Sequence, residues 1–205
     1  MAERRRPLAL IGGGGLLLAL SWWAASGDSV SNFEEDVFRF FNDWPDWLEN
    51  PVWPIMQLGA IATVPVVAAV VWVLTKKWRL GAGIAVAALG SWLLAKVVKD
   101  LVERGRPQDF LADVNFRPEW EGLGFVSGHA GIAFAMAAIL APHLSRPWKV
   151  VVWGLAVITG ALRMYTSAHL PLDITGGAGL GIAMAGVWQL ATLPSSQRHN
   201  ALPAA

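Results

Sequence analysis

The stretch LGAGIAVAALGSWLLAKVVKDLVERGRP, residues 80–107, joins an apolar segment to a cluster of charges, and it decides the fold class. Its first part, Leu80–Val98, approaches the roughly 20 apolar residues that a helix needs to cross a bilayer. Its many glycines and alanines are typical of helix faces that pack closely in lipid. The stretch therefore predicts a membrane-spanning helix that packs against neighbours and ends in charged residues.

Five further segments have the length and apolarity of a span: Pro7–Ser26, Val52–Leu74, Leu123–Ala141, Trp148–Thr166 and Leu170–Leu193. Hydrophobic residues make up 55% of the 205 residues and charged residues 15%, against about 25% charged in soluble domains. This composition and the net charge of +1 exclude a disordered chain and a nucleic-acid-binding protein. We expect an all-α, polytopic membrane protein, a six-transmembrane-helix bundle that forms one domain over residues 1–205.

The first segment has a second interpretation. Arg4–Arg6, a leucine-rich run and Ala24–Ser26 are also the parts of a cleavable signal peptide. A retained helix is favoured, because the apolar run is long for a signal peptide and its removal would leave an odd number of spans. The glycines at 12–15 are weak helix formers, so this helix should lean on a neighbour.

The distribution of basic residues predicts the orientation of the bundle. With the N-terminus and the C-terminus in the cytoplasm of a plasma-membrane protein, the cytoplasmic segments contain nine cations and one acid, Glu3, as the positive-inside rule requires. The cations are Arg4, Arg5, Arg6, Lys76, Lys77, Arg79, Arg146, Lys149 and Arg198.

Residues 31–50, between the first two spans, predict a short amphipathic helix at the outer membrane interface. Ser31 followed by Glu34 is the pattern of a capping box at a helix start. An apolar stripe follows at helical spacing, and the opposite face is acidic. An interfacial anchor is favoured over a lid that covers a site. The stripe consists of Phe33, Val37, Phe40, Phe41 and Trp44.

Ionisable residues gather at the outer ends of four predicted spans, where they are costly and usually functional. With the orientation above, all of them face the extracytoplasmic side. They are Lys96, Lys99, Arg104, Arg106, His129, Arg163, His169 and Asp173. We interpret Lys96 and Arg104 as interface anchors and the remainder as one site.

Several fixed cations, two imidazoles and a carboxylate suit phosphoryl transfer, in which catalysis is mostly positioning and electrostatic stabilisation. Arginine binds phosphate through its planar fork, and lysine adds a point charge. Ser127 and Gly128 begin a predicted helix, where backbone N–H groups bind anions well. One imidazole can attack phosphorus while the other protonates the leaving oxygen.

The spacing of these residues also resembles a known family. Lys99-x6-Arg106-Pro107, Ser127-Gly128-His129 and Arg163-x5-His169-x3-Asp173 are similar to the three motifs of the type-2 phosphatidic acid phosphatase superfamily. The resemblance covers a motif core of residues 99–173 and the six-helix layout. Val126 stands where the family usually has proline, and Leu162 where a serine often precedes the arginine.

The resemblance implies a role for each motif residue. His169 would attack phosphorus to form a phosphohistidine, Asp173 would orient it, and His129 would protonate the leaving group. The phosphate would be bound by the other motif residues, and no metal or other cofactor would be needed. The phosphate-binding residues would be Lys99, Arg106, Arg163, Ser127 and Gly128.

These observations predict an integral membrane lipid phosphatase with a lipid phosphate as its partner in the bilayer. The resemblance suggests undecaprenyl diphosphate, phosphatidylglycerophosphate or phosphatidate, and an outward-facing site favours the first. Three alternatives remain: a lipid phosphotransferase of the same superfamily, a transporter or channel with an anion-binding polar cluster, and a catalytically silent scaffold. Hydrolysis of a lipid phosphate in EDTA separates the enzyme from a transporter.

Overall fold

The computed structural model describes residues 2–27, 29–117 and 121–193, and the predicted C-terminal tail with Arg198 lies outside them. Helices make up 78% of the structure, and the described part contains no strand, as the all-α prediction requires. Three helices are long and apolar enough to cross a membrane, or four if one bent pair is counted as a span. The six-span count therefore stays a prediction.

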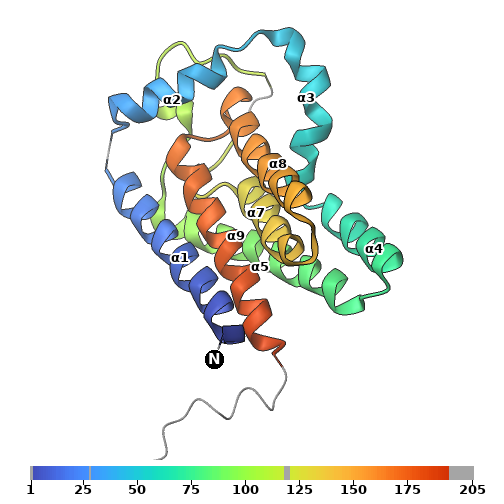
Figure 1. The fold of residues 1–205 in the computed structure, drawn as a ribbon. Coiled ribbons are helices and arrows are strands. Elements are labelled where there is room, and N and C mark those ends of the chain that lie inside the picture. Colours follow the sequence, from blue (N-terminus) through green and yellow to red (C-terminus); the bar gives the residue numbers. More distant parts are fainter. Residues whose placement is uncertain (1, 28, 118–120, 194–205) are drawn as a thin grey trace, which may run out of the picture.

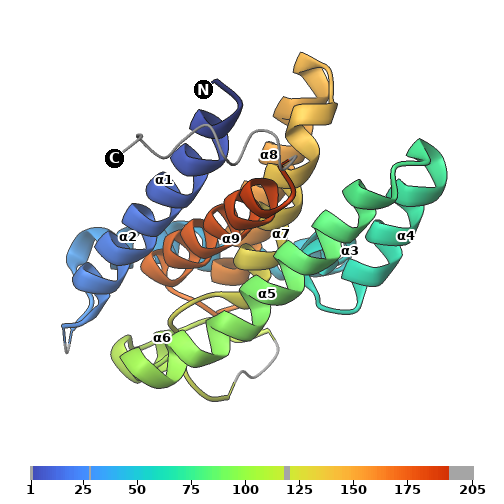
Figure 2. The same cartoon turned by 90° about the horizontal axis from the view of Figure 1, so that it is seen from below.

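The three long helices match predicted spans. They are α1 (Ala2–Ala25), α5 (Trp78–Val102) and α9 (Pro171–Ala191). Figures 1 and 2 show α1 and α9 lying side by side, with α5 crossing the other side of α9. Helix α9 begins at Pro171, within the predicted span Leu170–Leu193, because proline's missing N–H and fixed φ suit the first helical position.

Small residues bring these helices together, as predicted. A Cβ on Gly14 would lie 2.5 Å from the carbonyl oxygen of Gly179, and a Cβ on Gly179 would lie 2.6 Å from that of Gly14. The glycine-rich part of α1 therefore leans on α9. On the other side of α9, a Cβ on Gly177 would lie 2.3 Å from the carbonyl oxygen of Ser127, at the start of α7.

The predicted span Val52–Leu74 is not one continuous helix. The structure has α3 (Glu49–Met56), a 3-10 turn η2 (Gln57–Gly59) and α4 (Thr63–Thr75), with a bend of 72° between the two halves. The chain is extended at Ala60, and the hydroxyl of Thr63 donates to the carbonyls of Gln57 and Ala60, which also accept from the N–H groups of Ala60 and Thr63.

The predicted span Leu123–Ala141 begins later than expected. Residues 123–127 form a loop, and α7 runs from Gly128 to Leu140, followed by η3 (Ala141–His143). Ser127 is the N-cap of α7, and its hydroxyl accepts a hydrogen bond from the N–H of Ala130 at 3.4 Å. The predicted span Trp148–Thr166 corresponds to α8 (Arg146–Tyr165).

A helix is present where the amphipathic segment was predicted: α2 (Asn32–Asn42), followed by the 3-10 turn η1 (Asp46–Leu48). Figure 1 shows α2 lying across the ends of the bundle helices, on the side away from the N-terminus. Its placement at a membrane interface stays a prediction. Its buried residues are Glu34, Phe38 and Asn42, whereas Phe33 and Phe40 of the predicted apolar stripe are exposed. Part of the supposedly solvated acidic face is thus packed against protein.

Candidate active site

The three motifs meet at one end of the bundle. Lys99 ends α5, Ser127 to His129 begin α7, Arg163 ends α8, and Asp173 lies in the first turn of α9. His169 lies in the short loop between α8 and α9, whose N–H groups at Ala168 and His169 both donate to the carbonyl of Arg163. The predicted site residues, which are far apart in the sequence, therefore lie together at one place in the structure.

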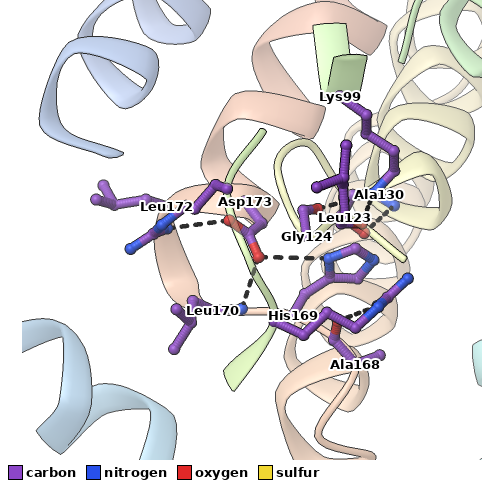
Figure 3. A network of polar contacts seen from close by, with 12 residues as sticks. Lys99, Leu123, Gly124, Ala130, Ala168, His169, Leu170, Leu172 and Asp173 are labelled. Carbon is purple, nitrogen blue, oxygen red and sulfur yellow. Dashed lines mark hydrogen bonds and ion pairs between the residues drawn. The ribbon is translucent and has the colours of Figure 1, made fainter. Parts of the chain in front are cut away.

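His169 and Asp173 form a close pair (Figure 3). Nδ1 of His169 lies 3.4 Å from Oδ2 of Asp173, longer than a well-formed hydrogen bond, as is common for catalytic groups before substrate tightens them. The same oxygen accepts from the N–H of Leu170 at 2.9 Å, since Asp173 is the third residue of its helix and reaches back to the helix start. Asp173 is fully buried, so its carboxylate has a fixed orientation.

The electrostatic environment keeps His169 neutral. Burial, followed by the nearby Lys99, Arg163 and Arg106, holds the pKa of the imidazole well below its usual range. The backbone of Gly124 opposes this shift through a hydrogen bond. A neutral imidazole is the nucleophilic form, so the surrounding cations favour the chemistry that the sequence predicts.

Lys99 and Arg106 both reach the surroundings of this imidazole. Nζ of Lys99 donates to the carbonyls of Leu123 and Gly124, at 2.5 and 2.9 Å. The guanidinium of Arg106 donates to the carbonyls of Glu121 and Gly122, and also to that of Ala168, beside His169. Main-chain oxygens thus hold two cations against the loop that precedes α7.

His129 and Arg163 complete the cluster. His129 is close enough to Arg163 and His169 for both to act electrostatically on its imidazole. Arg163 is buried, and its Nη1 lies 3.4 Å from Sδ of Met56 in α3. The break after α3 also places backbone against His129. Gly59 lies so close to α7 that a Cβ on it would be 2.7 Å from the carbonyl oxygen of His129. The bent pair therefore packs directly against the start of α7.

Ser127 connects the second and third motifs through its backbone. Its N–H donates to the carbonyl of Asp173 at 2.8 Å, and its side chain is fully buried as the cap of α7. Gly128 follows as the first residue of α7. The structure thus brings together all eight residues that the sequence predicted for the site: Lys99, Arg106, Ser127, Gly128, His129, Arg163, His169 and Asp173.

The interpretation of Arg104 as an interface anchor is wrong. Its side chain is 2% exposed, and its Nη1 donates to Oδ1 of Asp173 at 3.0 Å. The same guanidinium donates to both oxygens of Glu34, at 3.1 and 2.7 Å. Arg104 follows α5 in the loop before α6 (Pro107–Phe110), so its backbone turns inward rather than continuing along the membrane. Lys96, by contrast, lies over the ring of Trp92.

Sequence reasoning did not identify Glu34 as a site residue. Its carboxylate accepts from Arg104 and from the N–H of Leu172, which lies beside Asp173. The capping box is therefore half formed: the hydroxyl of Ser31 accepts from the N–H of Glu34, but the glutamate side chain turns to Arg104. A signal was available, because Glu34 is one of two acids in the first turn of α2 and Arg104 lies only two residues before Arg106.

Arg117 also has a structural role that the sequence did not indicate. It lies over the ring of Tyr165 and donates to the carbonyls of Asn42, Trp44 and Tyr165. Asn42 in turn bonds both to the loop at Asn115 and to the end of α8. These contacts attach α2 and the outer loop to the helix that supplies Arg163.

The described residues contain no cluster of three or more histidine, cysteine or acidic side chains that could hold a metal ion. The positive charges near His169 are instead supplied by lysine and arginine. The arrangement offers a neutral imidazole oriented by a carboxylate, a second imidazole and cations from α5, α8 and the loop before α6. Such a site can bind a phosphate group and attack its phosphorus.

Comparisons with known proteins agree with this geometry. The model of the PAP2 superfamily matches residues 76–194. Phosphatidylglycerophosphatase B of Bacillus subtilis is 28% identical over 152 residues, which cover 67% of this chain and 72% of the relative. The protein YbjG of Escherichia coli, named for an undecaprenyl-diphosphatase activity, is 30% identical over 155 residues, covering 72% and 77%.

Two solved structures share the fold. The crystal structure of LpxE from Aquifex aeolicus matches with a TM-score of 0.70 and 23% identity, over 80% of this chain and 98% of that one. The crystal structure of a transmembrane PAP2-type phosphatidylglycerolphosphate phosphatase from Bacillus subtilis gives a TM-score of 0.69 and 22% identity, over 97% and 99%.

Proposed function

Because the chain belongs to the PAP2 superfamily, we propose that it is an integral membrane lipid phosphatase that works through a phosphohistidine on His169. The observation that carries the proposal is the buried pair of His169 and Asp173, surrounded by the cations of the first and third motifs. In this proposal the chain acts as one domain, and its motif core runs from residue 99 to 173.

The reaction follows from the positions of the nitrogens. With Nδ1 of His169 turned to Asp173, Nε2 is the nitrogen that attacks phosphorus. As the N–P bond forms, the bond from phosphorus to the leaving oxygen breaks, and that oxygen takes a proton from His129. Water then attacks phosphorus, His129 takes its proton, and the N–P bond breaks to release phosphate and restore His169.

Asp173 has two tasks in this scheme. It holds the Nδ1–H tautomer of His169, and it stabilises the positive charge that the ring acquires when phosphorus is bound. Arg104 and Glu34 fix the carboxylate from the side opposite His169, so we assign them positioning roles. Lys99, Arg106, Arg163 and the Ser127–Gly128 segment bind the phosphate oxygens, whose charge grows in the transition state.

The favoured substrate is undecaprenyl diphosphate, with phosphatidylglycerophosphate and phosphatidate as the next candidates. A lipid suits a site at the end of a membrane bundle, since the tail stays in the bilayer while the headgroup enters the charged cluster. The similarity to YbjG supports a diphosphate, and the similarity to phosphatidylglycerophosphatase B supports a glycerolipid monophosphate. The basic residues at the other end of the bundle favour an extracytoplasmic site.

The test is phosphate release by the purified chain in nanodiscs, from a panel of these three lipids in the presence of EDTA. We expect release from at least one lipid and none from the His169→Ala variant. Acid-labile labelling of the native protein by a substrate carrying ³²P would support the phosphohistidine. Lipid or anion flux without hydrolysis would instead favour a transporter, and transfer of phosphate to a second lipid would favour the phosphotransferase.

A further inference from the structure

The end of the bundle opposite the catalytic groups contains a crevice with a volume of about 960 Å³. It lies among the start of α1, the turn between α4 and α5, the end of α7 with η3, and the end of α9. None of the residues that line it belongs to the site around His169. The mechanism proposed above makes no use of this crevice.

The crevice and the candidate active site lie at opposite ends of the bundle. Helix α5 runs from Trp78, which lines the crevice, to Lys99 in the site. At 1.5 Å per residue these 21 steps span about 32 Å, close to the hydrocarbon thickness of about 30 Å. Helices α7 and α9 also connect the two places, since each has one end in the site and the other in the crevice. The two places therefore belong to opposite membrane surfaces.

Basic side chains from three separate elements converge on the crevice: Arg6 from α1, Lys77 and Arg79 from the turn before and the start of α5, and His143 from η3. No lining residue is acidic. Within the described ranges, none of these cations forms an ion pair with a carboxylate. These residues form a basic rim around the crevice, and no acidic residue of the described chain neutralises it.

The rest of the lining is apolar and aromatic. Trp78 and Trp188 contribute their indoles, and Leu80 and Ile139 contribute buried aliphatic side chains. Gln189, which also lines the crevice, is held by a hydrogen bond to the carbonyl of Ala138. A ligand that satisfied both surfaces would need an anionic group for the rim and a hydrocarbon part for the walls.

We propose that this crevice binds an anionic phospholipid of the membrane leaflet opposite the catalytic site. The phosphate headgroup contacts Arg6, Lys77 and Arg79, and an acyl chain lies along the tryptophan walls. A soluble anion would leave the apolar walls unused. The inference does not depend on the proposed hydrolase activity.

The experiment uses native mass spectrometry of the purified full-length chain with dioleoyl-phosphatidylglycerol or dioleoyl-phosphatidylcholine. The test variant is Lys77→Ala/Arg79→Ala. The matched control is Arg146→Ala/Lys149→Ala, which removes the same charge from exposed residues that do not line the crevice. Arg6→Gln, on a different helix, provides a second test variant, and thermal melting in detergent verifies that each variant is folded.

We expect the native chain to retain phosphatidylglycerol in preference to phosphatidylcholine, and the control to do the same. The test variant should bind phosphatidylglycerol at least about ten-fold more weakly, because each cation near a membrane surface adds appreciable attraction to an anionic lipid. Arg6→Gln should weaken the binding of phosphatidylglycerol by a smaller factor, because it removes one cation instead of two. Equal losses in the test and control variants would overturn the proposal, since general surface charge would then explain binding. Equal retention of the two lipids by the native chain would overturn it as well.

Discussion

The Glu34→Gln substitution tests whether α2 takes part in catalysis through Asp173. Glutamine has almost the same shape as glutamate, and its amide oxygen can still accept from the N–H of Leu172 and from Nη1 of Arg104. Its amide nitrogen, however, cannot accept from Nη2 of Arg104, a contact of 2.7 Å in the native chain. The variant therefore removes one charge-assisted hydrogen bond and places two donors face to face.

The size of the effect follows from that lost contact. A hydrogen bond to a charged group contributes about 1.5–3 kcal/mol, and each 1.4 kcal/mol corresponds to a factor of ten. If losing this hydrogen bond misaligns Asp173, kcat should decrease by about 10- to 100-fold. KM should change little, because Glu34 lies on the side of Asp173 away from the phosphate-binding cations.

The neighbouring residue provides a matched control. Glu35 also pairs with an arginine, Arg39, but both side chains are about one-third exposed. Such pairs contribute about 0–1 kcal/mol, so Glu35→Gln should leave kcat within about three-fold of native. Phosphate release at saturating lipid measures kcat for both variants, and thermal melting in detergent reports their stability.

A double-mutant cycle separates positioning from general stability. If Glu34 acts through Asp173, then Glu34→Gln should add little to the loss already caused by Asp173→Asn. Additive losses in the double variant would refute the positioning role, because the two residues would then act independently. A native kcat in Glu34→Gln would refute it outright.

Further predictions concern the imidazole, its charge and the helix packing. His169→Ala should reduce turnover by several orders of magnitude while its melting temperature stays close to native, and a native rate would end the phosphohistidine proposal. Because the pKa of His169 lies well below its usual value near 6.5, the ring stays neutral as the pH falls through 6.5, so the half-maximal His169-dependent loss of kcat should lie well below that pH. A half-maximal loss at or above pH 6.5 would contradict the direction of this shift. Gly177→Ala should destabilise the fold and lower activity, because its Cβ would meet the carbonyl of Ser127 at 2.3 Å, whereas Gly12→Ala, with nothing within 4 Å, should be neutral or stabilising by melting temperature. Activity should survive EDTA, and its loss on chelation with recovery on adding Mg²⁺ would show that the lysine and arginine cations are insufficient.

The sequence was informative wherever one physical requirement dominated. Helices α1, α5 and α9 follow from apolar length, and the contacts of Gly14 and Gly177 follow from the need for close approach in lipid. The site residues could be predicted because cations, imidazoles and a carboxylate at span ends are too costly to lie there by chance. Pro171 also fixed the start of α9, because proline suits only the first turn.

The sequence misled where tertiary contacts override local pattern. Nothing in the apolar run from Val52 to Leu74 indicates that the helix breaks there. The break depends on the packing of Gly59 against His129 and on the hydrogen bond from the Thr63 hydroxyl to the carbonyl of Gln57. Glu34 was interpreted as part of a capping box and Arg104 as an interface anchor, because each was considered within its own segment. Their burial depends on a partner some 70 positions away, which local spacing does not indicate.

The carbonyls that hold Lys99 and Arg106 have a consequence for selectivity in a membrane crowded with phosphate. An incoming headgroup must compete with four uncharged main-chain oxygens of residues 121–124 and with that of Ala168. A terminal phosphate, with two negative charges and three free oxygens, can replace them all. The phosphodiester of an ordinary phospholipid, with one charge and two free oxygens, cannot. If the chain acts as proposed, this loop would favour dianionic headgroups over the phosphodiesters of the surrounding lipids.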